Sequence, residues 1–390
     1  YKLEFIFDKT IGEICVSDLS NSTNPTHSTN AFASALQQSG DFLSITRANE
    51  WSLPGGAFSF EVCHQASQTK SKVSVLNTGL ITFEPIDRAS NHDIVLSSAV
   101  HGNETAPIEI CSDIIGQLIR GELALAERVL FIFGNPASMN IAQRFVEENM
   151  NRLFSGGHSQ DQGQGPGLIN KERHRALLLE NTVREFFAAG SEVPSTNGIV
   201  RQRSHYDLHT AIRGSKCDKF AVYPFLHGAP RKKSQLQFLN ACGVSTVLLS
   251  HSPTTTFSYF SSNEFGADAF TVELGKVRPF GENDMSQFTQ VRETLTKFVS
   301  GQDLELTPYQ AEDFNLYEIS QVIDRHHEDF SLTFDDDVEN FTDFPKGHVL
   351  AIDGGNEVKT QQDGEAIIFP NANVAIGQRA MLTVTPTTLA

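Results

Sequence analysis

Two side chains that could bind a metal, His101 and Glu104, follow a strongly apolar stretch of this sequence. The run from Ile94 to Val100 is apolar and partly β-branched, which predicts a buried strand. Thr105 could cap the helix that follows, and Pro107 is tolerated in the first turn of a helix. His101 and Glu104 would therefore lie at the carboxyl end of a strand, where open α/β sheets place their ligands.

A catalytic zinc site needs a third protein ligand and an open position, and the best candidate for this ligand is His209. His209 follows a strand-like run, residues 204–208. Two histidines and one glutamate, split into a close pair and a distant partner, form the ligand set of many zinc hydrolases. Asp207 would share a face of the strand with His209, so its carboxylate could orient the imidazole. Taken alone, His101 and Glu104 would more often be a structural histidine beside a capping carboxylate.

A second glutamate, Glu273, ends another strand-like run, residues 270–272. His101, His209 and Glu273 thus lie at the ends of three strands that are predicted independently of one another. Because the carboxyl ends of parallel strands share one edge of a sheet, we expect these side chains to converge. An isolated glutamate at such a position would more often be a surface carboxylate.

Five blocks of the sequence, in the same order, closely resemble the succinylglutamate desuccinylase/aspartoacylase family, a branch of the zinc carboxypeptidase-like fold. The resemblance extends from about residue 41 to the C-terminus and includes the late stretches Phe369–Asn371 and Ala375–Ala380. The five blocks are His101–Pro107 (HGNETAP), Asn135–Pro136, Arg144–Phe154 (RFVEENMNRLF), Asp207–Ser215 (DLHTAIRGS) and Thr271–Asp284 (TVELGKVRPFGEND).

The resemblance implies a zinc-dependent amidohydrolase with one zinc ion per subunit, held by His101, Glu104 and His209. In such an enzyme the metal activates water and polarises the amide carbonyl. Glu273 would take the proton of the water and pass it to the leaving nitrogen, as a general base and then a general acid. The implied substrate is N-succinyl-L-glutamate, cleaved to succinate and L-glutamate in the last step of arginine catabolism through succinylated intermediates.

Such a substrate carries three carboxylates, whereas the chain has 30 Lys and Arg against 47 Asp and Glu, a net charge of −17. Salt screens this repulsion beyond about 8 Å, so arginines in the site must bind the substrate locally. The resemblance assigns this binding, and polarisation of the carbonyl, to Arg144, Asn151 and Arg152.

Two further arginines, Arg213 and Arg278, lie inside the matching blocks. They could bind the far carboxylates of the substrate. They could equally be structural salt-bridge partners of Asp207, Glu282 or Asp284, and the sequence leaves both interpretations open.

The order of strand-like and helix-like runs from residue 93 predicts a mixed, mainly parallel central sheet with helices on both faces. We expect a catalytic domain at residues 41–302 and, after a change in composition, a small β domain at residues 303–390. Residues 1–40 form an N-terminal extension of uncertain structure. Within it, residues 3–7 could form a strand, and residues 20–28 are predicted to be loop or disordered.

The acidic composition argues against nucleic acid or an anionic membrane as a partner. The sequence has no apolar run of about 18 residues and no evident signal peptide. Its five cysteines are widely spaced, as expected for reduced thiols. These features predict a cytoplasmic protein without a membrane span.

Other functions stay open at this point. An aspartoacylase-like deacylase or a zinc carboxypeptidase would use the same ligands, and a metal-binding protein without activity could keep them. Aspartoacylases use a tyrosine of their C-terminal domain, and the corresponding residues 371–377 contain none. The oligomeric state and the physiological metal are also open, because other divalent metals accept this ligand set.

Overall fold

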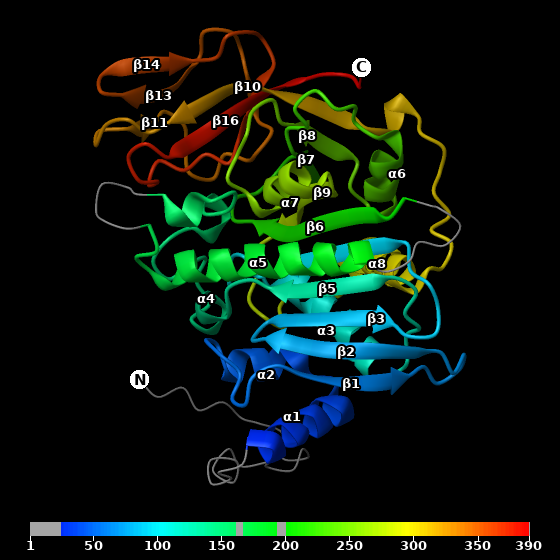
Figure 1. The fold of residues 1–390 in the computed structure, drawn as a ribbon. Coiled ribbons are helices and arrows are strands. Elements are labelled where there is room, and N and C mark those ends of the chain that lie inside the picture. The colour runs from blue at the N-terminus through cyan, green and yellow to red at the C-terminus, as the bar shows by residue number, and fades with distance from the viewer. Residues whose placement is uncertain (1–24, 161–166, 193–199, 390) are drawn as a thin grey trace.

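A large mixed sheet runs through the whole computed structural model and carries helices on both faces (Figure 1). The structure describes residues 25–160, 167–192 and 200–389. None of the helices in these ranges is long and apolar enough to cross a bilayer. The four cysteines described there, Cys63, Cys111, Cys217 and Cys242, are free thiols, which agrees with the expectation from their spacing.

The large sheet has thirteen strands in the order β1-β2-β3-β5-β4-β6-β9-β7-β8-β10-β16-β15-β12. Its strands are β1 Phe58–Cys63, β2 Lys70–Asn77, β3 Leu80–Pro85, β4 His92–Ser98, β5 Arg128–Phe133, β6 Gln202–Ala211, β7 Phe220–Tyr223, β8 Thr246–Leu249, β9 Asp268–Lys276, β10 Asn315–Asp324, β12 Asp343–Phe344, β15 Glu365–Ile368 and β16 Arg379–Pro386. A second sheet contains β11 Ser331–Leu332, β13 Val349–Asp353 and β14 Asn356–Lys359.

Helices cover both faces of the large sheet, and a separate hydrophobic core lies between the sheet and the helices on each face. One core packs against α3, α6 and α8, and the other packs against α5 and α7. The helices are α1 Pro25–Ser39, α2 Phe42–Ala48, α3 Thr105–Ile119, α4 Pro136–Asn140, α5 Lys171–Glu192, α6 Lys233–Ala241, α7 Phe257–Phe265 and α8 Thr289–Ser300, with short 3₁₀ turns η2 Met150–Arg152, η3 Gly157–Ser159, η5 Met285–Phe288 and η6 Ala311–Asp313.

The centre of the sheet is parallel, as the alternation of strands and helices predicts. Strand β4 pairs in parallel with β5 and β6, and β6 pairs in parallel with β9. Strands β4 and β5 are buried almost throughout, because helices cover both of their faces. The edge formed by β1, β2 and β3 is antiparallel. The predicted fold class is therefore confirmed.

The C-terminal β region continues the central sheet instead of lying apart from it. Strand β10 pairs in parallel with β8, starting with Asn315 opposite Thr246, and β16 then pairs antiparallel with β10. Phe220 and Leu248 of the central strands share a hydrophobic cluster with Leu382 and Val384 of β16. The boundary near residue 302 stays a prediction.

Two local predictions differ from the structure. Helix α1 begins at Pro25, inside the stretch 20–28 that was expected to be loop, because proline is well suited to the first turn of a helix. The possible strand at residues 3–7 lies outside the described residues. Glu104, and not Thr105, occupies the N-cap position of α3, without a side-chain capping bond, and the Thr105 hydroxyl donates to the Arg278 carbonyl at 2.7 Å.

Candidate metal centre and active site

The three adjacent parallel strands β4, β6 and β9 bring the candidate residues to one edge of the sheet. His101 follows β4 by three residues, and His209 and Glu273 lie near the carboxyl ends of β6 and β9. His209 and Glu273 are direct partners in the register of these two strands. The strands therefore converge as the sequence predicts, although β6 and β9 each extend past the residue of interest.

His101, Glu104 and His209, here called the metal cluster, offer ligand atoms that all lie within 4.8 Å of one another. Nδ1 of each imidazole is 2.8 Å from a different oxygen of Glu104. On the other side, Nε2 of His101 is 2.9 Å from Asn149 Oδ1, and Nε2 of His209 is 2.8 Å from Asp207 Oδ2. Both outer partners are acceptors, so each Nε2 carries a hydrogen and each Nδ1 is directed at the centre of the cluster.

Gly102 allows the loop between β4 and α3 to place these ligands. A Cβ atom at this position would lie 2.1 Å from the backbone nitrogen of Met139 in α4, so only glycine fits. The Gly102 amide donates to the Arg144 carbonyl at 3.2 Å, which joins the loop to the segment that follows α4. Ala99, just after β4, has a positive φ of 56°, so the chain turns sharply before His101.

The protonation of the metal cluster suits a cation. Burial and the nearby Arg144 charge lower the pKa of His101 to about 4, so this imidazole is neutral. Burial opposes the charge on Glu104, but the two histidines and Arg144 hold the pKa of this carboxyl well below its usual range. Burial likewise disfavours charge on His209, but Asp207 and Glu104 raise its pKa well above its usual value, so a metal ion would have to displace the Nδ1 proton of this imidazole. Two imidazoles and an ionised carboxylate are a ligand set that zinc accepts.

Glu273 lies beside the metal cluster with its charge poorly compensated. Its side chain is 7% exposed, and Oε2 has no hydrogen-bond partner among the described residues. Burial, and then the neighbouring charge of Glu104, raise the pKa of Glu273 to about 7. A β-bulge follows at once, with Gly275 at a φ of +128°, a conformation that L side chains rarely adopt. A carboxyl group with this pKa can exchange a proton near neutral pH.

The three proposed substrate-binding residues lie close to the metal cluster. Arg144 Nη1 donates to Glu104 Oε1 at 2.6 Å. Arg152 Nη1 donates to the carbonyl of Asn151 at 2.9 Å, and Asn151 Oδ1 accepts from the Phe257 amide at 3.1 Å. Burial of Asn151 and its bond to the start of α7 hold the Asn-Arg pair in place.

The structure places Arg213 and Arg278 differently. Arg213 Nη1 donates to the Val338 carbonyl at 2.9 Å, and its guanidinium lies 3.8 Å from Asp336. These contacts tie β6 to the C-terminal region and support the structural alternative, with partners other than those expected. Arg278 is exposed, and its backbone carbonyl accepts from Thr105 near the metal cluster.

Two residues that lie beside the candidate site residues were not singled out from the sequence. Asn149 binds His101 and also caps η2, the turn that carries Asn151 and Arg152. Arg379 of β16 lies close enough to Arg152 that burial, followed by the charges of Arg379 and Arg144, lowers the pKa of Arg152. Asn149 lies inside a matching block, so its polar side chain was a usable signal. Arg379 lies 227 positions after Arg152, and nothing in the sequence pairs them.

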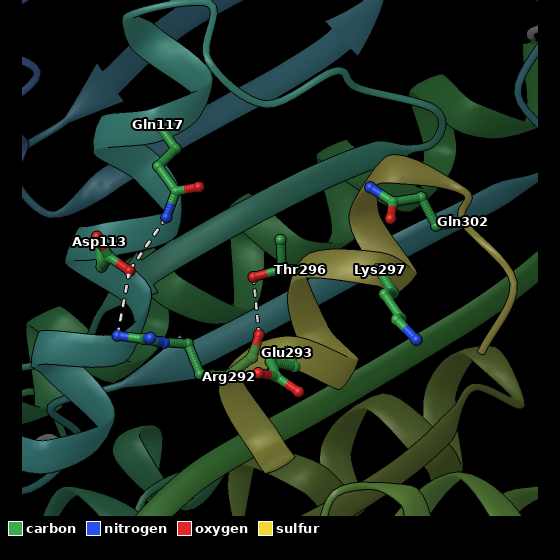
Figure 2. A pocket seen from close by; sticks show the side chains of 7 residues that line it. All are labelled: Asp113, Gln117, Arg292, Glu293, Thr296, Lys297 and Gln302. Atoms are coloured by element: carbon green, nitrogen blue, oxygen red, sulfur yellow. Dashed lines mark hydrogen bonds and ion pairs between the residues drawn. The ribbon is translucent and has the colours of Figure 1, made fainter. Parts of the chain in front are cut away.

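A separate polar hollow of about 520 Å³ lies between α3 and α8 (Figure 2). Asp113 of α3 accepts from Gln117 at 3.1 Å and lies 4.0 Å from Arg292 of α8. Asp113 is nine residues beyond Glu104, roughly 13 Å along the helix axis. The hollow contains none of the candidate catalytic residues and is not part of the site.

Comparisons with known proteins identify the family to which the chain is similar. The family model described as succinylglutamate desuccinylase/aspartoacylase catalytic domain matches residues 90–299, and the AstE/AspA barrel-sandwich hybrid domain matches residues 312–387. A succinylglutamate desuccinylase of Pseudoalteromonas atlantica is 52% identical over 364 residues, which cover 93% of this chain and 99% of the relative. One from Idiomarina loihiensis is 52% identical and covers 88% and 95%.

Solved structures agree as well. The succinylglutamate desuccinylase of Vibrio cholerae is 34% identical with a TM-score of 0.76, covering 88% of this chain and 94% of that one. The enzyme of Chromobacterium violaceum is 35% identical with a TM-score of 0.72, covering 90% and 98%. The chain belongs to the succinylglutamate desuccinylase/aspartoacylase family.

Proposed function

We propose that this protein is a zinc-dependent amidohydrolase that cleaves N-succinyl-L-glutamate to succinate and L-glutamate. The observation that carries the proposal is the metal cluster with Glu273 beside it, in a chain 52% identical to nearly the whole of a protein named succinylglutamate desuccinylase. With this substrate, the reaction is the last step of arginine catabolism through succinylated intermediates. We propose that the protein acts in the cytoplasm.

Zinc would be held by Nδ1 of His101, Nδ1 of His209 and the carboxylate of Glu104, one ion per subunit. These three side chains are buried, and the ligand atoms face one another. The metal supplies Lewis acidity, which activates water and polarises the scissile amide. Asn149 and Asp207 keep the two imidazoles in the tautomer that presents Nδ1.

Glu273 is the proton-transfer residue in this proposal. Its carboxylate takes the proton of the attacking water and then delivers that proton to the leaving nitrogen of glutamate. A pKa of about 7 suits both steps, because the group can be either ionised or protonated near neutral pH. Its unpaired Oε2 leaves one oxygen free to accept this proton.

The carboxylates of the substrate would be bound by Arg144, Arg152 and Arg379, with Asn151 beside them. The low pKa of Arg152 reflects burial first and then two neighbouring cations, so an anion between these groups would be strongly stabilised. Arg379 is itself half-buried, and its guanidinium stacks 5.9 Å from the ring centre of Phe369. Arg213 and Arg278 are not part of this binding set, because the guanidinium of Arg213 is already bonded to backbone carbonyls and Arg278 is exposed.

The first test measures free amino acid released from N-succinyl-L-glutamate by protein stripped of metal and then given zinc. N-acetyl-L-aspartate and a blocked dipeptide are run beside it. Zinc-dependent release from the succinyl compound alone is the expected result. Preference for either other compound would retain the metal chemistry and change the substrate, to that of an aspartoacylase-like deacylase or a carboxypeptidase.

A further inference from the structure

A buried chain of hydrogen bonds extends from the metal cluster into the core behind β6. Asp207 Oδ1 accepts from Ser97 Oγ at 2.6 Å, Ser97 Oγ is 2.8 Å from His205 Nε2, and His205 Nδ1 is 2.7 Å from Ser261 Oγ. All four side chains have no measurable exposure. The other carboxylate oxygen of Asp207 binds His209, so this chain, here called the Ser261–Asp207 chain, ends on a proposed metal ligand.

The direction of each hydrogen bond in the Ser261–Asp207 chain follows from the number of protons available. Ser97 has one hydroxyl proton, and it goes to Asp207, because a buried carboxylate oxygen can only accept. His205 must therefore donate to Ser97 from Nε2–H, and its Nδ1 must accept from the Ser261 hydroxyl. Burial lowers the pKa of His205 to about 4, which keeps the ring neutral and compatible with this single arrangement.

The Ser261–Asp207 chain also links the strands that carry the two histidine ligands. Ser97 of β4 and Asp207 of β6 are direct register partners. His101 follows Ser97 by four residues, and His209 follows Asp207 by two. The Ser97–Asp207 bond therefore joins the strands just before each one delivers its ligand. His205 is held in turn by edge-on packing on Phe257, with ring centres 4.6 Å apart.

We propose that Ser97 and His205 are positioning residues for the metal centre, acting through Asp207 on the orientation of His209. A carboxylate bonded only to the imidazole could rotate about its own side chain and carry the ring with it. Here Ser97 donates to the Asp207 carboxylate and His205 donates to Ser97. These bonds fix the plane of the carboxylate, so Nδ1 of His209 stays directed at Glu104. Hydrogen-bond partners outside the ligand shell typically change metal affinity about 10–100-fold when removed. This inference rests on the proposed metal site.

The test compares zinc affinity among purified variants, by competition with a chromophoric chelator. Ser97→Ala and His205→Leu should each weaken zinc binding about 10–100-fold. His205→Gln should recover most of the affinity, because the glutamine amide can place an N–H donor near the position of Nε2.

A matched control exists in the same pair of strands. His92 of β4 has its Nε2 2.8 Å from Ser204 Oγ of β6 and packs edge-on against Phe298, but its hydrogen bonds do not lead to Asp207. Like His205, it has a pKa that burial lowers to about 4. His92→Leu should leave zinc affinity unchanged.

Unfolding of the metal-free proteins separates positioning from general stability. Each zinc titration is made at a temperature at which circular dichroism shows the variant folded. Unchanged affinity in both folded Ser97→Ala and His205→Leu overturns the inference, and so does an equal loss in His92→Leu. Wild-type protein that binds zinc but does not cleave N-succinyl-L-glutamate would overturn the proposed substrate alone, and protein that binds no zinc would overturn both proposals.

Discussion

The two ends of strands β4 and β6 both hold buried charges, but they balance these charges differently. At the amino end, Asp93 Oδ1 accepts from Arg128 at 2.6 Å and from Arg201 at 2.8 Å. These three residues are here called the Asp93 cluster. At the carboxyl end, the imidazoles of the metal cluster converge on one carboxylate, and a second carboxylate, Glu273, lies next to it.

An unpaired buried oxygen alone does not distinguish the two ends, because both Asp93 Oδ2 and Glu273 Oε2 lack a hydrogen-bond partner within the described ranges. The space and the charge around these two oxygens do distinguish the two ends. A Cβ atom on Gly190 of α5 would lie 2.0 Å from Asp93 Oδ2, so the helix closes that site. Burial raises the pKa of both carboxyls, but the charges of Arg128 and Arg201 oppose the rise at Asp93, whereas the charge of Glu104 adds to it at Glu273. The amino end is thus complete as it stands, and the carboxyl end is suited to a cation and a proton transfer.

The largest expected effect is on catalysis at the carboxyl end. Glu273→Gln should lower kcat about 10²–10⁴-fold, because general base catalysis contributes this much. Zinc affinity should change little, since Glu273 is not among the proposed ligands. Steady-state kinetics and a zinc titration measure the two quantities. Glu84→Gln is the control, because Glu84 accepts from Arg128 at the other end and should leave kcat unchanged. A Glu273→Gln variant with most of its activity would rule out the assigned role.

The reverse pattern is expected at the amino end. Arg128→Met should destabilise the fold by about 3 kcal/mol, because it leaves the buried carboxylate of Asp93 with one partner fewer. Zinc affinity and kcat of the folded variant should stay close to those of the wild type. Urea unfolding measures the loss. The exposed pair Arg120–Glu122 gives a control, since Arg120→Met should cost less than about 1 kcal/mol. Similar losses in both variants would argue against a structural role specific to the Asp93 cluster.

An effect of at most similar size concerns pH and the stability of the metal-free protein. The pKa of Glu273 is about 7 when folded and 4.5 as its ordinary value, so between these pH values the folded state binds more protons than the unfolded state. Stability contributed by the protonated group is thus present below pH 4.5 and lost as the pH rises to 7. At pH 8, metal-free Glu273→Gln should exceed metal-free wild type in stability by up to about 3 kcal/mol.

Chemical unfolding of both metal-free proteins at several pH values between 4 and 8 tests this sign. The difference between the variants should shrink towards zero near pH 4. A constant difference across this range would mean that the substitution acts through packing and not through the charge of Glu273.

The sequence predicted the elements of the site better than the contacts between them. Residues 94–96 are apolar, as expected where both faces of a strand are buried, and this pattern in β4 can be read locally. The strand that carries His209 is buried from Ser204 onward but is rich in polar residues, so its burial cannot be read from an apolar pattern. A local sequence pattern does not show which strands are neighbours in a sheet or in what register they pair. The pairing of Ser97 in β4 with Asp207 in β6 was therefore found only in the structure.

Long side chains were the hardest to place. Arg213 was predicted either to bind a substrate carboxylate or to pair with a nearby acidic residue, but it donates to carbonyls of the C-terminal region, at Val338 among others. The expected partners were all within the matching blocks. An arginine has several rotatable bonds and five donors, so its partner is decided by packing of segments far apart in the sequence.

The last difference between the two ends concerns the arginines. At the carboxyl end, the positive charge of Arg379 and its neighbours would be balanced by the substrate and not by carboxylates of the protein, and substitution of Arg379 tests this. Arg379→Met should raise KM for N-succinyl-L-glutamate about tenfold, the size expected for a lost bond to a charged group, with a smaller change in kcat and none in zinc affinity. Arg379→Lys should retain part of the binding, because it keeps the charge but loses the planar fork of donors. Arg292→Met, in the hollow between α3 and α8, is the control and should leave KM unchanged. If KM is the same for Arg379→Met and wild type, β16 contributes no cation to the substrate, and Arg144 and Arg152 must bind its carboxylates alone.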